Sequence, residues 1–166
     1  ETLKGIMFKP WKHTAIRENP SRDWQTRRLM KPQPFFHNGV LRWQPRKGID
    51  INLTDHPDFA IPFAKFKISE VVYIKEAWAT ENKYNHLKPR HLPLQRKTLT
   101  TAKIFYLSDI HYDPFTMGVR RSPLFMPAWA ARTFIQITDV RPERLWDITE
   151  EDVKAEGIEV KGWTED

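Results

Sequence analysis

A proline-bent, apolar loop framed by arginines constrains this chain more than any other stretch. The loop runs from Arg120 to Arg132 with the sequence RRSPLFMPAWAAR. Its two prolines lock φ and remove two backbone donors, which predicts a bent loop rather than a helix or a strand. Residues 133–138 (TFIQIT) follow at once, and their β-branched and aromatic content predicts a buried strand. The chain therefore folds around a stiff loop that leads straight into a sheet.

The same loop carries the side chains that a base-binding surface needs. Met126 and Trp129 offer sulfur and aromatic surface for stacking, and three arginines, Arg120, Arg121 and Arg132, frame them. Aromatic rings stack on bases, while arginines contact phosphates and ring faces. The alternative is a loop that lines the core with its arginines in solvent, and the sequence leaves both open.

Composition limits the class of protein. A chain of 166 residues fits one domain with a sizeable core, or one domain with a long insertion, and we expect a single domain over residues 1–166. The absence of cysteine excludes disulfides and thiolate zinc sites and suits a reducing, cytoplasmic location. We find neither an apolar run of membrane-span length nor the apolar core of a signal peptide, so we expect no membrane partner.

The charge is distributed unevenly. The net charge is +6, but residues 139–166 hold ten acids and four bases, whereas residues 1–138 hold 23 bases and 11 acids. A strongly basic body with an acidic C-terminal segment favours a polyanionic partner such as nucleic acid.

Hydrophobic patterns predict short strands, two short helices and proline-broken connections. The expected strands are residues 5–8, 41–44, 49–53, 71–78, 103–107 and 134–137, and the expected helices are residues 11–18 and 148–157. Thr149 is the expected N-cap of the second helix and Gly157 its C′ residue. In the first helix we expect Trp11, Ala15 and Ile16 to face inward. Residues 25–30, if extended, would alternate cations with apolar side chains.

Three further features need interpretation. Glu76 is a carboxylate in the most β-branched run of the chain, so it either pairs with an arginine or takes part in chemistry, and pairing is favoured. Residues 80–101 are basic and proline-broken, which suggests a mobile insertion that contacts nucleic acid. Residues 109–113 (DIHYD) contain three potential metal ligands at every second position. A turn fits this segment better, because Pro114 follows directly. We therefore predict no metal or other cofactor.

Five motifs in a fixed order resemble one family. They are QTRR with KPQP at residues 25–34, VYIKEAW at 72–78, FMPAWAAR at 125–132, ITDVRPERL at 137–145, and DITEED with AEGI at 147–158. Together they resemble the ASCH-domain proteins of bacteriophages and prophages, a branch of the PUA-like superfamily. The resemblance covers residues 5–34, 68–79 and 120–158.

The resemblance implies a mainly β fold with flanking helices, namely a small PUA-like β-barrel, in a protein of the bacterial cytoplasm. PUA-like relatives bind RNA or modified bases in a cleft. One relative is an N4-acetylcytidine amidohydrolase, whose catalytic threonine and glutamate fall on Thr26 and Glu150. Its lysine falls on Asp23, and an aspartate cannot supply the basic amine of a lysine that activates a nucleophile.

We therefore expect a nucleic-acid-binding or modified-nucleoside-binding module, with RNA favoured over DNA. The expected ligand-binding residues are Arg27, Arg28, Glu76, Trp78, Met126, Trp129 and Arg132, and the expected phosphate-binding residues are Lys31, Arg120 and Arg121. The alternatives are an amidohydrolase that acts on an acylated base through Thr26 and Glu150, and a phage protein that binds a host protein.

Overall fold

The chain divides into two compact units, which we describe one at a time. The structure is a computed structural model that describes residues 3–92 and 102–158. Unit 1 comprises residues 1–22 and 71–136, and unit 2 comprises residues 23–70 and 137–166. The expectation of a single domain stays a prediction.

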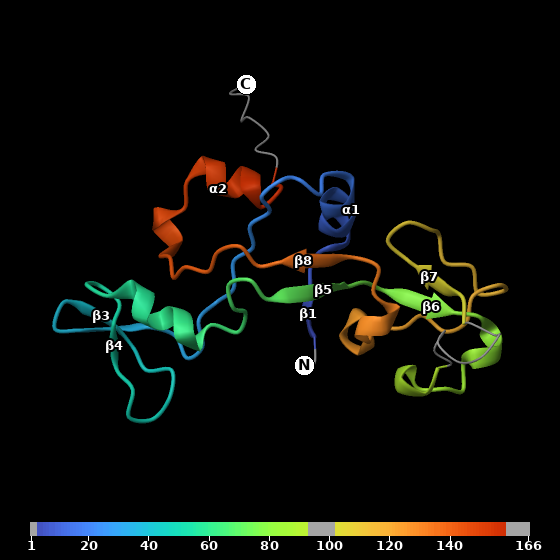
Figure 1. Ribbon diagram of the computed structural model, residues 1–166, viewed down its shortest axis with the longest axis horizontal. Coiled ribbons are helices and arrows are strands. Elements are labelled where there is room, and N and C mark those ends of the chain that lie inside the picture. Colours follow the sequence, from blue (N-terminus) through green and yellow to red (C-terminus); the bar gives the residue numbers. More distant parts are fainter. Residues whose placement is uncertain (1–2, 93–101, 159–166) are drawn as a thin grey trace, which may run out of the picture. The chain divides into compact units, whose positions relative to one another are not determined.

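The centre of unit 1 is a three-stranded sheet in the order β1-β5-β8 (Figure 1). β1 (Lys4–Met7) runs parallel to β5 (Val71–Lys75), and β8 (Phe134–Gln136) runs antiparallel to β5 on its other side. Val72 and Ile74 are fully buried in the central strand. β-branched side chains suit a buried strand that lies between two neighbouring strands. β8 follows the proline-rich loop as predicted, but Phe134 is 48% exposed, so the strand is not buried throughout.

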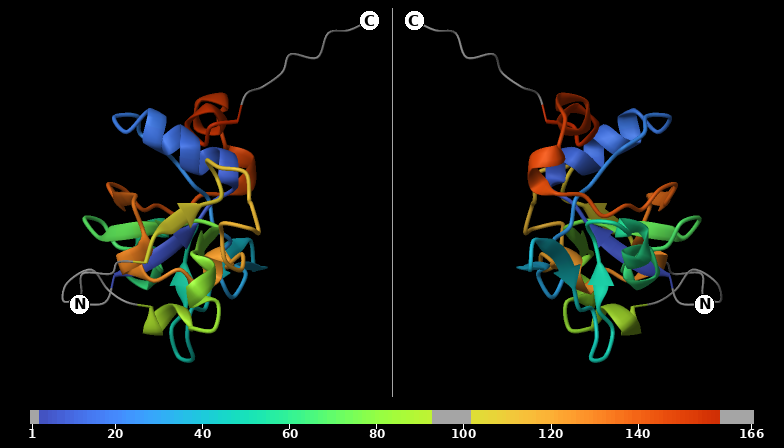
Figure 2. Two further views of the ribbon diagram at one scale, coloured as in Figure 1. Left: turned by 90° about the vertical axis from the view of Figure 1, so that its right-hand side faces the viewer. Right: turned by 90° about the vertical axis from the view of Figure 1, so that its left-hand side faces the viewer.

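Helix α1 (Pro10–Glu18) lies on one side of this sheet (Figures 1 and 2). Pro10 occupies the first turn, where its missing N–H costs nothing. His13 and Ile16, three residues apart, share the buried face. Trp11 is 47% exposed, so the expectation that it faces inward was wrong. Its position is one residue outside the stripe that repeats every three to four residues.

The expected strand at residues 71–78 is divided in two by Glu76 and Ala77. β6 (Trp78–Thr80) leaves the first sheet and pairs antiparallel with β7 (Ile104–Tyr106). Four short 3₁₀ turns complete unit 1: η2 (Asn82–Tyr84), η3 (Pro89–His91), η4 (Pro123–Phe125) and η5 (Ala128–Ala130). The core of this part consists of Trp78, Leu92, Met126 and Ala130.

The first half of the expected basic insertion packs against the rest of unit 1. Leu92 is 3% exposed, and Tyr84 and Leu87 pack against the same core cluster. Asn85 accepts a hydrogen bond from the Val119 N–H at 2.7 Å. The rest of the insertion, residues 93–101, lies outside the described residues, and so do the nucleic-acid contacts expected there.

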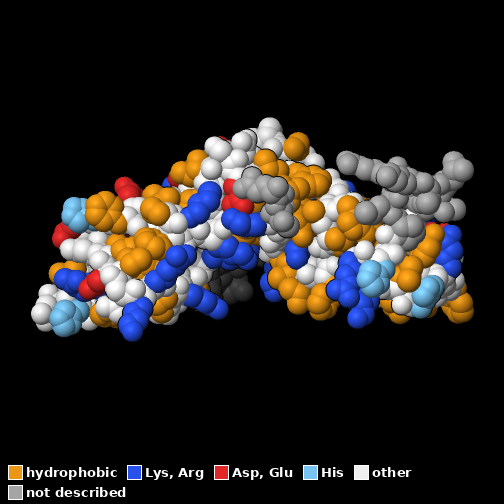
Figure 3. Space-filling model, turned by 60° about the horizontal axis from the view of Figure 1, so that its bottom comes forward, with side chains coloured by type: hydrophobic (Ala, Val, Ile, Leu, Met, Phe, Trp, Pro, Cys, Tyr) orange, Lys and Arg blue, Asp and Glu red, His pale blue; other side chains and the backbone are white. Residues whose placement is uncertain are grey.

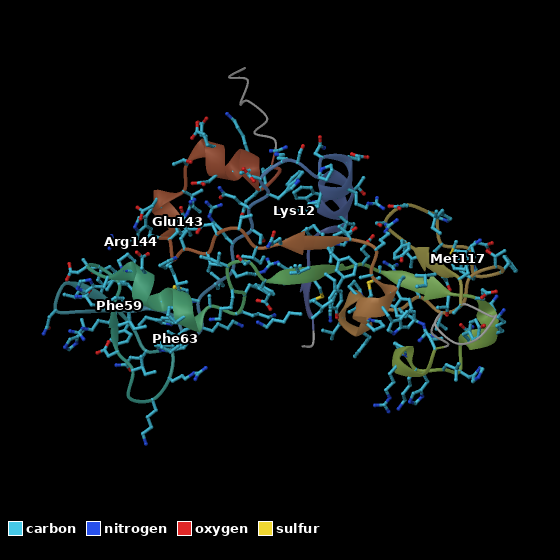
Figure 4. The ribbon with its side chains drawn as sticks, viewed as in Figure 1. Lys12, Phe59, Phe63, Met117, Glu143 and Arg144 are labelled. Atoms are coloured by element: carbon cyan, nitrogen blue, oxygen red, sulfur yellow. The ribbon has the colours of Figure 1, made fainter. Side chains whose placement is uncertain are left out.

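Unit 2 contains a small antiparallel meander in the order β2-β3-β4. Its strands are β2 (Phe35–His37), β3 (Val40–Trp43) and β4 (Ile51–Asn52). The β3–β4 hairpin was expected, but β2 was not. Residues 57–63 form the 3₁₀ helix η1 (Pro57–Phe63), whose Phe63 ring meets Trp43 edge-on at 6.1 Å (Figure 4).

The C-terminal part of unit 2 consists of η6 (Leu145–Asp147) and the short helix α2 (Glu150–Ala155). Thr149 is the N-cap, as predicted, and it forms a capping box with Asp152. At the other end Gly157 has φ +84° and donates to the Lys154 carbonyl at 2.7 Å, and Ile158 donates to the Val153 carbonyl at 3.2 Å. These two bonds form a Schellman motif, so both predicted ends of the helix are confirmed.

The described residues thus form a mixed α/β structure with eight strands in three small sheets and two α-helices. None of the three sheets closes into a barrel. Residues 25–30, considered as an extended segment, form no strand. Among the described residues, no helix has both the length and the apolar character needed to cross a lipid bilayer.

Candidate functional site

The loop between β7 and β8 has one buried side and one exposed side. Met126 and Ala130 are 1% and 0% exposed, because they fill the core beneath the loop. Leu124, Phe125 and Trp129 point away and are 56%, 64% and 36% exposed. We call Leu124, Phe125 and Trp129 the loop surface. Ser122 caps η4 by accepting from the Leu124 N–H, and two prolines fix the backbone, so the loop surface is held on a stiff support.

Trp129 of the loop surface packs against an aromatic ring, which in turn contacts an arginine. Trp129 meets Trp78 edge-on, with 6.3 Å between ring centroids. The Arg121 guanidinium lies 5.5 Å from the Trp78 ring and donates to the Tyr84 carbonyl at 3.1 Å. Burial lowers the pKa of Arg121. Arg121 therefore packs against the Trp78 ring in an arrangement that favours cation–π attraction.

Two of the expected ligand-binding residues lie inside the core. Trp78 is 0% exposed. The Met126 sulfur accepts from the Glu76 N–H at 3.2 Å, and the Met126 carbonyl accepts from the Tyr73 hydroxyl at 3.1 Å. Neither Trp78 nor Met126 offers surface to a ligand in this structure, so both contribute to the shape of the loop.

Glu76 and Arg132 are joined at the centre of an ion-pair chain in unit 1. Arg132 donates to both oxygens of the fully buried Glu76, through Nε at 3.0 Å and Nη2 at 2.6 Å. The Ser108 hydroxyl also donates to Glu76, at 2.6 Å. Arg132 also forms an ion pair with Asp109. The Asp109 carboxylate accepts two hydrogen bonds of 2.7 Å from Arg17 on α1. The predicted pairing of Glu76 with an arginine is confirmed.

The charges of the ion-pair chain balance one another. Burial raises the pKa of Glu76, but the hydrogen bonds from Arg132 and Ser108 outweigh burial, and the net shift is downward. Hydrogen bonds from Arg17 and Arg132 hold the pKa of the Asp109 carboxyl far below its usual range. Two carboxylates and two guanidiniums thus neutralise each other, so Arg132 is committed to the protein and has little charge to offer a phosphate.

His13 lies next to this ion-pair chain without joining it. Its side chain is buried. Burial lowers the pKa of His13, and the positive charges of Arg132 and Arg17 add to that effect, while the Glu76 carboxylate and the Phe8 carbonyl oppose it. The imidazole is therefore neutral at pH 7.

Unit 1 carries other cations besides Arg121 and Arg132. Lys75 donates to the Leu124 carbonyl at 2.9 Å, and Arg120 is exposed. The described residues of unit 1 carry 13 Lys and Arg against five Asp and Glu. On the face drawn in Figure 3, Lys and Arg side chains lie beside exposed hydrophobic ones. Unit 1 is thus the basic part of the protein.

The remaining predicted residues belong to unit 2. Thr26, Arg28, Lys31 and Glu150 are exposed. Arg27 is half-buried and faces three carboxylates, those of Glu143 at 2.9 Å, Glu156 at 3.3 Å and Asp152 at 3.4 Å. Glu143 itself precedes η6 (Figure 4). Arg27 is therefore surrounded by negative charge, which disfavours a phosphate contact.

The local sequence does not indicate these three carboxylates as partners of Arg27. Their ion pairs join residues more than a hundred positions apart, and no local spacing encodes such a contact. Only the acidic composition of residues 139–166 gave a general signal. Among the described residues, no three His, Asp or Glu side chains are grouped so that they could hold a metal ion.

Comparisons with family models, with curated proteins and with solved structures gave no match to this chain.

Proposed function

We propose that unit 1 binds nucleic acid or a modified nucleoside through the loop surface, with RNA favoured over DNA. One observation carries the proposal. The most basic part of the chain displays two exposed aromatic rings, Phe125 and Trp129, on a proline-stiffened loop whose other side is locked into the core. The resemblance to ASCH-domain proteins supports the same proposal, and with it a PUA-like arrangement of the strands.

The loop surface suits this role because stacking and charge come from different residues. Phe125 and Trp129 provide ring faces for unpaired bases. Arg120 provides an exposed charge for a phosphate. The buried Trp78 packs against the Trp129 ring, so little conformational entropy is lost when a ligand stacks on Trp129.

Binding of fluorescent single-stranded RNA and DNA oligonucleotides across a salt series tests the proposal. Affinity should fall as salt rises, and Phe125→Ala should weaken it by about 5- to 150-fold, corresponding to about 1–3 kcal/mol per stacked base. Phe115→Ala is the matched control, since Phe115 is 90% exposed in the same unit but lies outside the proline-stiffened stretch from Arg120 to Arg132. Binding that is absent at low salt, or equally weakened by both variants, would refute the proposal.

A second candidate function is an amidohydrolase acting on an acylated base such as N4-acetylcytidine. One observation favours it. The Gln25 N–H donates to the Ala155 carbonyl at 3.1 Å, and Arg27 pairs with residues on and next to α2. The segment that carries Thr26 is therefore attached to the helix that begins with Glu150, as two cooperating catalytic groups would require.

Incubation with N4-acetylcytidine, followed by separation of cytidine and acetate, tests this candidate. Thr26→Ala should abolish any product formation. Thr138→Ala, an exposed threonine of the same unit, should leave it unchanged. No cytidine from the parent protein, or equal product from Thr26→Ala and the parent, excludes catalysis by Thr26.

A further inference from the structure

The meander of unit 2 has two faces of different character. In register, Phe35 lies opposite Arg42, and Arg42 lies opposite Asn52, so these side chains share one face. The alternate residues, among them Trp43 and Ile51, belong to the other face and form the core of the unit. Because the side-chain period of a strand is two, the core residues leave the Phe35 and Arg42 face open.

This open face contains a shallow hollow with a volume of about 280 Å³. Its walls are Phe35, His37, Arg42, Gln44 and Asp50. Phe35 is 41% exposed, although the sheet that contains it buries Trp43 and Ile51 on the other face. A ring at this position is not needed for the core.

The chemistry of the hollow favours a flat, polar aromatic ligand over a bare anion. Arg42 already donates to Asp50 at 2.7 Å, so its charge is largely offset, and the Asp50 carboxylate would repel a phosphate. Phe35 presents a ring for stacking, the Gln44 amide can donate and accept, and Asp50 can accept. A nucleobase has the matching features, namely a π face and an edge with donors and acceptors.

We propose that the open face of the β2-β3-β4 sheet is a separate nucleobase-binding site. The base stacks on Phe35 beside Arg42, and its edge meets Gln44 and Asp50. The hollow takes an unpaired base either from a free nucleotide or from a single strand. Only the second source rests on the function proposed above, in which a strand also contacts the loop surface of unit 1.

Titration of the ¹⁵N-labelled full chain with AMP, CMP, GMP and UMP tests the site by NMR. At least one nucleotide should shift the amide signals of residues 35–44 and 50–52. Phe35→Ala should raise the dissociation constant about 5- to 150-fold, the range expected for loss of one stacking ring. Ribose 5-phosphate, which lacks a base, should cause no such shifts; shifts of equal size would overturn the proposal.

Phe36→Ala is the matched control. Phe36 is adjacent in sequence, is 63% exposed and pairs with Leu41, so the same change is made on the opposite side of the strand. Its dissociation constant should stay within twofold of the parent value. Gln44→Ala, at an exposed residue that lines the hollow, is a second test and should also raise the dissociation constant. Equal effects of Phe35→Ala and Phe36→Ala would overturn the proposal.

Oligonucleotides identify the source of the base and separate this proposal from the earlier one. A single strand whose binding is weakened by both Phe35→Ala and Phe125→Ala supports both. Mononucleotide binding that depends on Phe35, with no oligonucleotide binding, supports a nucleotide site and refutes the function proposed for unit 1. Oligonucleotide binding that depends on Phe125 alone, without mononucleotide shifts, refutes the site on the sheet and leaves the loop surface standing.

Discussion

At the scale of single residues, Glu76 shows how burial and pairing determine what a charge can do. A fully buried carboxylate is tolerated because Arg132 and Ser108 satisfy it with three hydrogen bonds. The same bonds withdraw Arg132 from solvent. A residue that the sequence suggests for ligand binding thus acts in this structure to hold the loop before β8 against the end of β5.

Arg132→Met should lower the free energy of unfolding by about 3–5 kcal/mol, because it leaves the buried Glu76 carboxylate without its partner. Urea denaturation at pH 7 measures the loss. Arg120→Met, at an exposed arginine, should change stability by less than about 0.5 kcal/mol. A double variant, Glu76→Leu with Arg132→Met, should recover part of the loss; if it is less stable than Arg132→Met alone, the interpretation is wrong.

His13 should make stability depend on pH. Its pKa in the folded protein lies below the usual 6.5, so its contribution is complete above about pH 6.5 and is lost as the pH falls through that value toward the folded pKa. The slope should reach at most about 1.4 kcal/mol per pH unit. His13→Gln should flatten the curve of unfolding free energy between pH 7 and pH 5.

Urea denaturation at half-unit pH steps provides this curve. His111→Gln, a change at an exposed histidine of the same unit, is the matched control. A parent protein whose stability stays constant between pH 7 and pH 5, or a His13→Gln variant with the parent's slope, contradicts the expectation.

At the scale of elements, α2 exists because both of its ends are capped. Six residues are too few for a helix that is stable by propensity alone. The capping box of Thr149 and Asp152 satisfies the first turn, and the Schellman motif at Gly157 satisfies the last. Arg27 adds ion pairs from outside the helix. Each of these features except the Arg27 contact can be recognised in the sequence.

Thr149→Ala should destabilise α2 by about 1 kcal/mol, since it removes the side-chain acceptor of the Asp152 N–H. Thr149→Ser keeps that acceptor and should stay close to the parent. Amide hydrogen exchange of residues 150–157, measured by NMR, reports the local change. Equal exchange rates in the Ala and Ser variants would show that the cap does not limit opening of the helix.

At the scale of the whole molecule, the two units differ in charge. The described residues of unit 1 carry a large excess of cations, whereas those of unit 2 carry 11 Lys and Arg against 12 Asp and Glu. Non-specific affinity for nucleic acid depends on the number of phosphates that cations contact. We therefore expect the salt dependence of binding to arise in unit 1, even if a base also binds on the sheet of unit 2.

Neutralising pairs of cations can test this expectation. Lys88→Gln with Arg120→Gln in unit 1 should reduce the slope of log affinity against log salt by up to about 0.7 per lost phosphate contact on a single strand. Lys47→Gln with Arg144→Gln, the same change of charge in unit 2, should leave the slope unchanged. Equal reductions would show that both units contact phosphates.

Much of the secondary structure could be predicted from local sequence. The strands near residues 5, 42, 51, 104 and 135, the first helix and both caps of α2 follow from β-branched content, proline positions and capping residues, which act within a few positions. The expected strand at 71–78 was too long, because β5 ends at Lys75 and Trp78 begins β6, which pairs with the distant β7 in a second sheet. β2 was not predicted, since Phe35 and His37 gain their strand geometry from pairing with β3.

The sequence by itself determined the proline-stiffened loop from Arg120 to Arg132 and the basic excess of the N-terminal 138 residues, and it favoured an arginine partner for Glu76 over a role in chemistry. Only the tertiary structure decided that this partner is Arg132, 56 positions away, that Met126 lies in the core and that Phe125 is exposed. The physical reason is distance along the chain. Proline, charge and β-branching act locally or by composition, whereas burial and ion pairing depend on which distant segments meet.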